Sequence, residues 1–117
     1  MNVLIDSATP ECIVIRLREG TEEVTVTGWH TDRAVRSLLT ALDTIAGGDG
    51  YAECFWPEPT GQYWWMFNRE GRRLEVVVLW SRGAVTGWQH VFRAADEVGY
   101  LIERIHDEMA ARRLLPR

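Results

Sequence analysis

The stretch from residue 51 to residue 80 constrains the fold most strongly, because it reads as three consecutive β-strands crowded with aromatic residues. Trp56, Trp64 and Trp65, three of the six tryptophans, lie within ten residues of one another, and Trp80 ends the stretch. Large aromatic side chains dominate protein cores and interfaces, since each can bury about 150–250 Å². The fold and the function therefore both depend on which of these rings point inward.

Residue periodicity predicts the secondary structure of the whole chain. Alternating apolar residues predict strands over residues 2–6, 12–18, 22–28, 51–56, 62–68, 72–80 and 88–93. Helical spacing predicts one amphipathic helix that Thr31 caps and Ala46 ends, and a second helix that begins near Asp96 and Glu97. Residues 81–87 are predicted to form a loop. This order indicates an α+β fold with a largely antiparallel sheet of five or six strands and both helices on one face.

Length and composition indicate one globular domain spanning residues 1–117. The chain is 46% hydrophobic and 26% charged, and a core of this size needs neither disulfides nor metal. Its net charge of −4, without a basic stripe, argues against a nucleic-acid partner. No apolar run approaches the roughly 18–20 residues of a membrane span, and the N-terminus lacks the pattern of a signal peptide. We therefore expect a cytoplasmic protein that does not bind membranes.

Strand periodicity then sorts the side chains between two faces. If the helices cover one face, the more uniformly apolar set should point inward: Ile13, Ile15, Leu17, Val24, Val26, Cys54, Trp56, Tyr63, Trp65, Phe67, Leu74, Val76, Val78, Trp80, Trp88 and Phe92. The opposite face then mixes apolar residues such as Leu79 with charges such as Glu75. Such a mixture is typical of an interaction surface. A one-residue bulge would exchange the two faces.

The mixed face and the neighbouring turn supply the predicted contact residues. The aromatic side chains would anchor a protein partner, and the two carboxylates would pair with its basic groups. The predicted contact residues are Tyr51, Glu53, Phe55, Glu58, Trp64 and Met66.

The sequence carries no signature of catalysis or of metal binding. Glu53 and Glu75 share a predicted face, but paired carboxylates catalyse reactions only within a cleft that holds a substrate. The histidines and cysteines lack the short paired spacings of metal ligands: they are His30, His90, His106, Cys12 and Cys54. We expect His90 to be a partly buried histidine and Cys54 a small core residue. We therefore predict no catalytic residue, no metal and no cofactor.

The segment from Cys54 to Trp80, with the following strand and closing helix, resembles small bacterial immunity proteins. These are the antidotes encoded beside polymorphic toxins, and the resemblance is in particular to the wall-associated-protein immunity family. The shared features are the Glu58-Pro59 turn between aromatic strands, a glycine turn, a valine-rich strand and a closing strand–helix unit, spanning roughly residues 31–112. The resemblance implies a cytoplasmic protein that binds a toxin domain and blocks its active site. The acidic charge of this chain and its predicted exposed carboxylates indicate that such a partner would be basic.

Two other functions remain open at this point. One is a small-molecule binder or minor enzyme with a tryptophan-lined pocket between sheet and helices, in which Trp88 and His90 would supply the aromatic and polar groups. The other is a homodimer that joins through the open sheet face and has no further partner.

Overall fold

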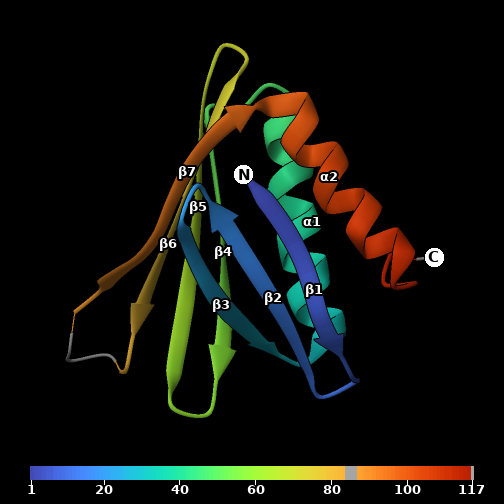
Figure 1. Ribbon diagram of the computed structural model, residues 1–117, viewed down its shortest axis with the longest axis vertical. Helices are drawn as coiled ribbons and strands as arrows, with labels where there is room; N and C mark the ends of the chain where they lie inside the picture. Colours follow the sequence, from blue (N-terminus) through green and yellow to red (C-terminus); the bar gives the residue numbers. More distant parts are fainter. Residues whose placement is uncertain (84–86, 117) are drawn as a thin grey trace.

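The computed structural model describes residues 1–83 and 87–116 (Figure 1). In chain order its elements are β1 (Asn2–Ala8), β2 (Cys12–Glu19), β3 (Glu22–Trp29), α1 (Thr31–Ala46), β4 (Tyr51–Glu58), β5 (Gly61–Glu70), β6 (Arg73–Ser81), β7 (Gln89–Glu97) and α2 (Val98–Ala111). Each predicted strand is found within a few residues of its predicted bounds. Part of the predicted loop, residues 84–86, lies outside the described residues.

The strands form two antiparallel sheets, so the prediction of a single five- or six-stranded sheet is wrong. Sheet A has the order β1-β2-β3 and sheet B has the order β4-β5-β6-β7. The α+β class with two helices is confirmed. The sheets meet through side chains: a Cβ built on Gly28 of β3 would lie 2.7 Å from the ring of Trp56 on β4. Because the two backbones are separated by side chains there, β3 crosses sheet B without extending it.

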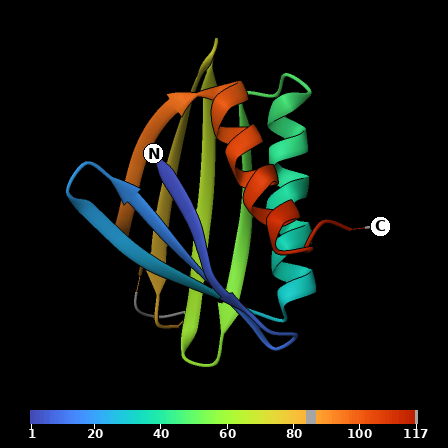
Figure 2. The ribbon, with the colours of Figure 1, turned by 45° about the vertical axis from the view of Figure 1, so that its right-hand side comes forward.

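Sheet B has one covered face and one open face. Both helices and sheet A lie on the same side of it, as Figure 2 shows. Helix α1 packs mainly on β4, and α2 contacts β6, β7 and β1. Among the described residues, no helix is both long enough and apolar enough to cross a membrane.

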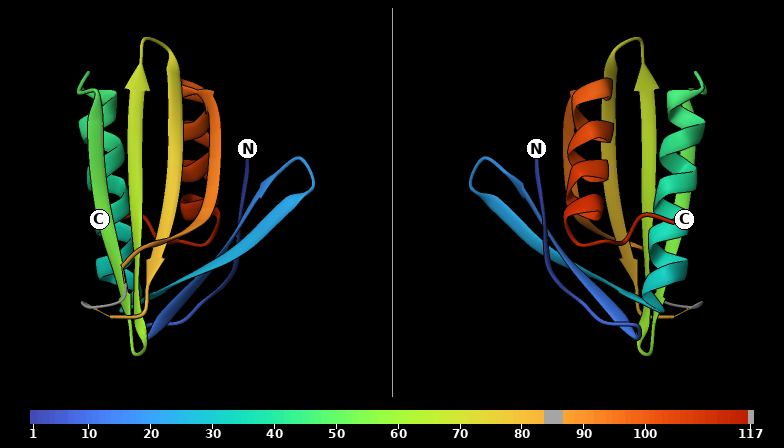
Figure 3. Two further views of the ribbon diagram at one scale, coloured as in Figure 1. Left: turned by 90° about the vertical axis from the view of Figure 1, so that its left-hand side faces the viewer. Right: turned by 90° about the vertical axis from the view of Figure 1, so that its right-hand side faces the viewer.

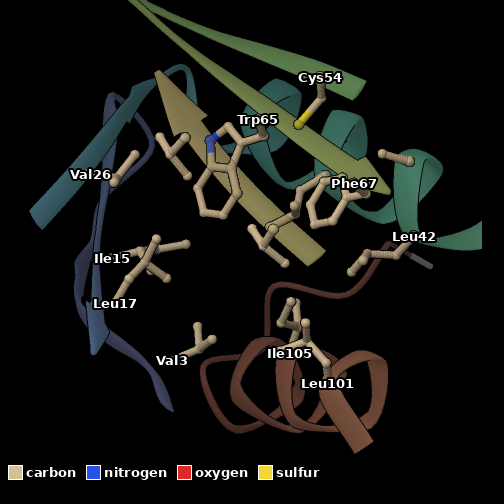
Figure 4. Packing of buried hydrophobic residues seen from close by; sticks show 14 of the residues in the cluster. Val3, Ile15, Leu17, Val26, Leu42, Cys54, Trp65, Phe67, Leu101 and Ile105 are labelled. Carbon is tan, nitrogen blue, oxygen red and sulfur yellow. The ribbon is translucent and has the colours of Figure 1, made fainter. Parts of the chain in front are cut away.

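Side chains from both sheets and both helices meet in one core (Figure 4). Most of the residues predicted to point inward are buried there: Ile13, Ile15, Leu17, Val26, Cys54, Trp56, Trp65, Phe67, Leu74, Val76, Val78 and Phe92. Val24, Tyr63 and Trp80 are half-buried, whereas Trp88 is exposed. Strand alternation therefore identifies the core correctly, with the exception of Trp88.

The first helix begins differently from the prediction that Thr31 caps it. The N-cap is His30, which has a left-handed φ of 59° and makes no capping bond through its side chain. The hydroxyl of Thr31 instead donates a hydrogen bond to the carbonyl of Thr9, in the turn between β1 and β2. Thr31 is thus buried and ties the start of α1 to sheet A.

The second helix begins at a carboxylate cap. The side chain of Glu97 accepts hydrogen bonds from the backbone N–H groups of Gly99, at 3.0 Å, and Tyr100, at 2.7 Å. These bonds satisfy amide groups that have no partner within the helix. They lower the pKa of Glu97 below its ordinary value, because they favour the charged carboxylate.

The close approach at Gly28 predicts a loss of stability on adding a methyl group. A Cβ at this position would lie 2.9 Å from the Cβ of Ala34 as well as against Trp56, so Gly28→Ala should overpack the junction between sheets. We expect the free energy of unfolding to fall by about 1–3 kcal/mol in urea titrations. Gly50→Ala is the control, since its nearest contact would be an ordinary 3.6 Å. Equal stability of the two variants would contradict this packing.

The cap of α2 predicts a pH-dependent contribution to stability. The Glu97→Gln variant keeps a side-chain oxygen but cannot ionise. Because the folded pKa is lowered, the advantage of wild type should be fully present above the ordinary pKa of 4.5. It should disappear as the pH falls through the lower folded pKa. Urea unfolding of both proteins from pH 7 to pH 3 measures this, and a difference independent of pH would contradict the charged cap.

Candidate protein-binding face

The outer face of sheet B, which points away from the helices, presents the candidate site. Along β4 the residues alternate, so that Cys54 and Trp56 are buried while Phe55 is exposed. The adjacent Trp64 and Trp65 on β5 likewise point to opposite faces, and only Trp65 enters the core. The left view of Figure 3 looks onto the outer face, and both helices lie behind the sheet in this view.

Three rings on this face form what we call the aromatic cluster: Phe55, Trp64 and Trp88. The rings of Phe55 and Trp64 stack, with centroids 5.6 Å apart and an interplanar angle of 20°. The ring of Trp88 meets Trp64 edge-on at 5.2 Å and Phe55 at 6.3 Å. Phe55 is 42% exposed and Trp88 is 39% exposed. The three side chains therefore form one continuous apolar patch that solvent reaches.

Apolar residues extend this cluster across the sheet. Trp64 lies between Phe55 and Leu79 in the strand register, and Met66 lies between Glu53 and Val77. Trp64, Met66, Val77 and Leu79 are all partly exposed. The outer face thus carries an apolar band across β4, β5 and β6.

Trp88 joins the cluster because β7 contains a bulge. Val78 of β6 pairs with Phe92, whereas the next residue, Leu79, pairs with His90, so Val91 is the extra residue. A residue added to one strand reverses the faces of those beyond it. The prediction that Trp88 points inward is therefore wrong, and so is the prediction that His90 is partly buried, since both are exposed.

Glu53 lies beside the aromatic cluster and holds Trp64 in position. The indole Nε1–H of Trp64 donates to the Oε2 atom of Glu53 at 2.7 Å, and the hydroxyl of Tyr51 donates to the same oxygen at 3.0 Å. Burial raises the pKa of Tyr51, and the hydrogen bond and negative charge of Glu53 raise it further. The carboxylate thus links two aromatic residues of the face.

The charges of the outer face are unevenly balanced. Glu75 is paired with Arg93, whose Nη2 and Nε atoms lie 2.6 Å and 2.9 Å from the Oε2 atom of Glu75. Glu53, by contrast, takes part in none of the ion pairs among the described residues. A negative charge without a cationic partner therefore borders the aromatic cluster.

The structure brings five of the six predicted contact residues to one face, and Glu58 is the exception. Tyr51, Glu53, Phe55, Trp64 and Met66 share the outer face. Glu58, the last residue of β4, accepts hydrogen bonds from the hydroxyls of Thr27 on β3 and, at 3.3 Å, Thr60. Its carboxylate therefore connects the two sheets instead of facing a partner beside the aromatic cluster.

Trp56 and Trp65 are packed in the core and line none of the pockets among the described residues. Trp56 and Trp65 are 0% and 1% exposed, and their ring centroids lie 4.9 Å apart. Trp88 and His90, which the pocket hypothesis requires, lie on the outside of the molecule. The residues proposed for a tryptophan-lined pocket between sheet and helices are therefore not brought together.

The thiol of Cys54 lies behind the outer face, in the core. Burial raises the pKa of Cys54 to about 12, so its thiol is protonated near neutral pH and is a poor nucleophile. Within residues 1–83 and 87–116, no group of three or more His, Cys, Asp or Glu side chains is placed to hold a metal ion. The outer face offers flat rings, a thioether and a carboxylate, which are the components of a recognition surface.

The contact between Tyr51 and Glu53 predicts a coupled titration. Glu53→Gln removes the negative charge that disfavours the tyrosinate, so the pKa of Tyr51 should fall. It should stay above its ordinary value of 10, because burial also raises it. Carbon NMR of the Tyr51 ring between pH 8 and pH 12 measures the shift. Glu103→Gln on α2 is the matched charge control, and an equal shift in both variants would contradict a local effect.

No protein-family model matches this sequence, and comparison with curated proteins and with solved structures finds no significant match. The resemblance to immunity proteins therefore depends on the residues described above and stays a prediction.

Proposed function

We propose that this chain is a noncatalytic protein-binding module and that the outer face of sheet B is its docking surface. The observation that supports this best is the exposed aromatic cluster on a sheet face that neither helix covers. Exposed tryptophan and phenylalanine side chains are unfavourable in water, and they are enriched at the centres of protein interfaces. Leu79, Met66 and Val77 widen the patch into a surface that a partner could cover.

The shape of the face favours a macromolecule over a small ligand. Small-molecule sites enclose most of the ligand surface within a cavity. The three rings of the aromatic cluster instead contact one another at centroid distances of 5.2–6.3 Å, so they leave no enclosed space between them. An open apolar band that crosses three strands is better matched by a protein surface.

Charge favours a different protein over a second copy of this chain. In a two-fold dimer, each subunit contributes the same surface patch to the interface. Two copies of Glu53 would then be buried together, while the nearby Arg93 is already paired with Glu75. Burying carboxylates without cations is costly. A partner with a basic surface would instead supply the missing positive charge.

The specific form of the proposal is an immunity-type inhibitor that blocks a bacterial toxin domain. Its support is the resemblance of the segment from Cys54 to the closing helix, together with an acidic balance of 17 Asp and Glu residues against 13 Arg and Lys residues. An acidic inhibitor is attracted over long range to a basic enzyme, which speeds association.

A photocrosslinking residue within the aromatic cluster tests the docking surface. The photoreactive residue benzoylphenylalanine, placed at position 55 in the cells that produce the protein, should crosslink a partner that mass spectrometry identifies. The same residue at position 100, where the exposed Tyr100 lies on α2, should not capture it.

Once the partner is purified, the Trp64→Ala variant tests the central ring of the cluster. Calorimetry should show that it binds the partner more weakly by about 2 kcal/mol, which is roughly 30-fold.

The control variant is Tyr100→Ala, because Tyr100 is an aromatic residue 46% exposed on a different surface. It should bind the partner as wild type does. Circular dichroism and urea unfolding establish that both variants remain folded. Equal affinities for wild type and a folded Trp64→Ala variant, or an identical crosslink from positions 55 and 100, would refute the proposed face. A crosslink to a second copy of the chain would favour the homodimer instead.

A further inference from the structure

We propose that the outer face recognises an arginine side chain of its partner, which lies against the aromatic cluster and pairs with Glu53. This inference rests on the proposed function and specifies the chemistry of the same site. The occupant is a protein segment that places one guanidinium group between apolar side chains. Three features of the face support this proposal: a carboxylate that forms no ion pair with the described residues, adjacent flat rings, and an arginine on the same sheet that is already paired.

The first feature is the way in which Glu53 is hydrogen-bonded. Both of its neighbours, the indole of Trp64 and the hydroxyl of Tyr51, donate to Oε2. Both donors are neutral, so they orient the carboxylate without cancelling its charge. Among the described residues, the hydrogen bonds to Glu53 both end on Oε2, and none ends on Oε1. An incoming donor therefore finds an oriented, negatively charged acceptor.

The second feature is the position of the rings beside this carboxylate. Trp64 donates directly to Glu53, and its ring continues into Phe55 and Trp88. A cation over such rings is attracted by their π-electrons. Guanidinium combines this contact with planar hydrogen-bond donors and is weakly hydrated, whereas the ammonium group of lysine is a strongly hydrated point charge. The combination of rings and carboxylate therefore fits arginine better than lysine.

The third feature is that Glu53 forms no ion pair among the described residues, either with Arg36 of α1, which lines a pocket with it, or with an arginine of sheet B. Arg93 lies on the same cross-strand row as Glu53, three strands away on β7, because Glu53 pairs with Met66, Met66 with Val77 and Val77 with Arg93. Two of its guanidinium nitrogens are bound by Glu75. Moving Arg93 to Glu53 would leave Glu75 without its partner. The positive charge that complements Glu53 is consequently expected from outside.

A peptide comparison tests the inference without knowledge of the natural partner. The probes are acetyl-Leu-Arg-Leu-amide and the same peptide with citrulline or lysine in place of arginine. Citrulline keeps the shape of arginine and removes its charge. The readout is the indole Nε1–H signal of Trp64 in proton–nitrogen NMR spectra, assigned with Trp64→Phe. We expect the arginine peptide to bind about tenfold more tightly than the citrulline peptide, and more tightly than the lysine peptide.

Glu53→Gln separates charge from structure, because its amide oxygen can still accept the hydrogen bonds of Trp64 and Tyr51. This variant should lose the preference for arginine over citrulline. The control Glu103→Gln removes one negative charge from an exposed position on α2 and should keep the preference. Raising the salt concentration to 0.5 M should reduce the preference in wild type.

Different results would overturn the recognition of arginine and the proposed docking face. Equal binding of the arginine and citrulline peptides at Trp64, or of the arginine and lysine peptides, would overturn the guanidinium assignment and leave the docking face intact. Retention of the arginine preference in Glu53→Gln would overturn the role of Glu53. If no peptide moves the Trp64 signal at 10 mM, the inference is overturned, and the crosslink at position 55 then decides separately whether the face binds a protein.

Discussion

The buried side chain of Trp56 is the contact on which the arrangement of the two sheets and helix α1 depends. Its indole Nε1–H donates to the carbonyl of Ala34 on α1 at 3.0 Å. Its ring lies against Gly28 of β3 and against Trp65 of β5. One fully buried residue thus joins sheet A, sheet B and a helix. Gly28 permits this contact, because any larger residue would force the ring away.

The position of Trp56 also determines what sheet B presents to solvent. Neighbouring residues on a strand point to opposite faces, so burying Trp56 and Trp65 places Phe55 and Trp64 on the outer face. Packing of the core requires only that the residues on the outer face are compatible with β-strands. Polar residues that favour β-strands would meet this requirement. Aromatic rings there leave apolar area in water at a cost of about 25 cal/mol per Å². A partner that covered the rings would remove this cost, which supports the proposal that they bind another protein.

Sequence patterns predicted the local structure better than the way in which its parts meet. Alternation located the strands and the inward set from Ile13 to Phe92, because period and burial are local properties. The division into two sheets was missed, since whether β3 pairs with β4 or crosses it depends on contacts such as Gly28 on Trp56. Trp88 was misplaced because a bulge at Val91 leaves no distinctive residue in the sequence. Glu58 was placed near the site because the predicted strand ended at residue 56, two residues before the end of β4.

The bulge in β7 and the carboxylate of Glu53 give the site properties that no single strand could provide. The bulge turns Trp88 outward while Phe92 remains in the core, so one irregularity adds a third ring to the cluster. Glu53 fixes the indole of Trp64 through a 2.7 Å hydrogen bond in the free protein. A ring that is already held in place loses less rotational freedom when a partner covers it. The outer face is therefore preorganised by the same strands that build the core.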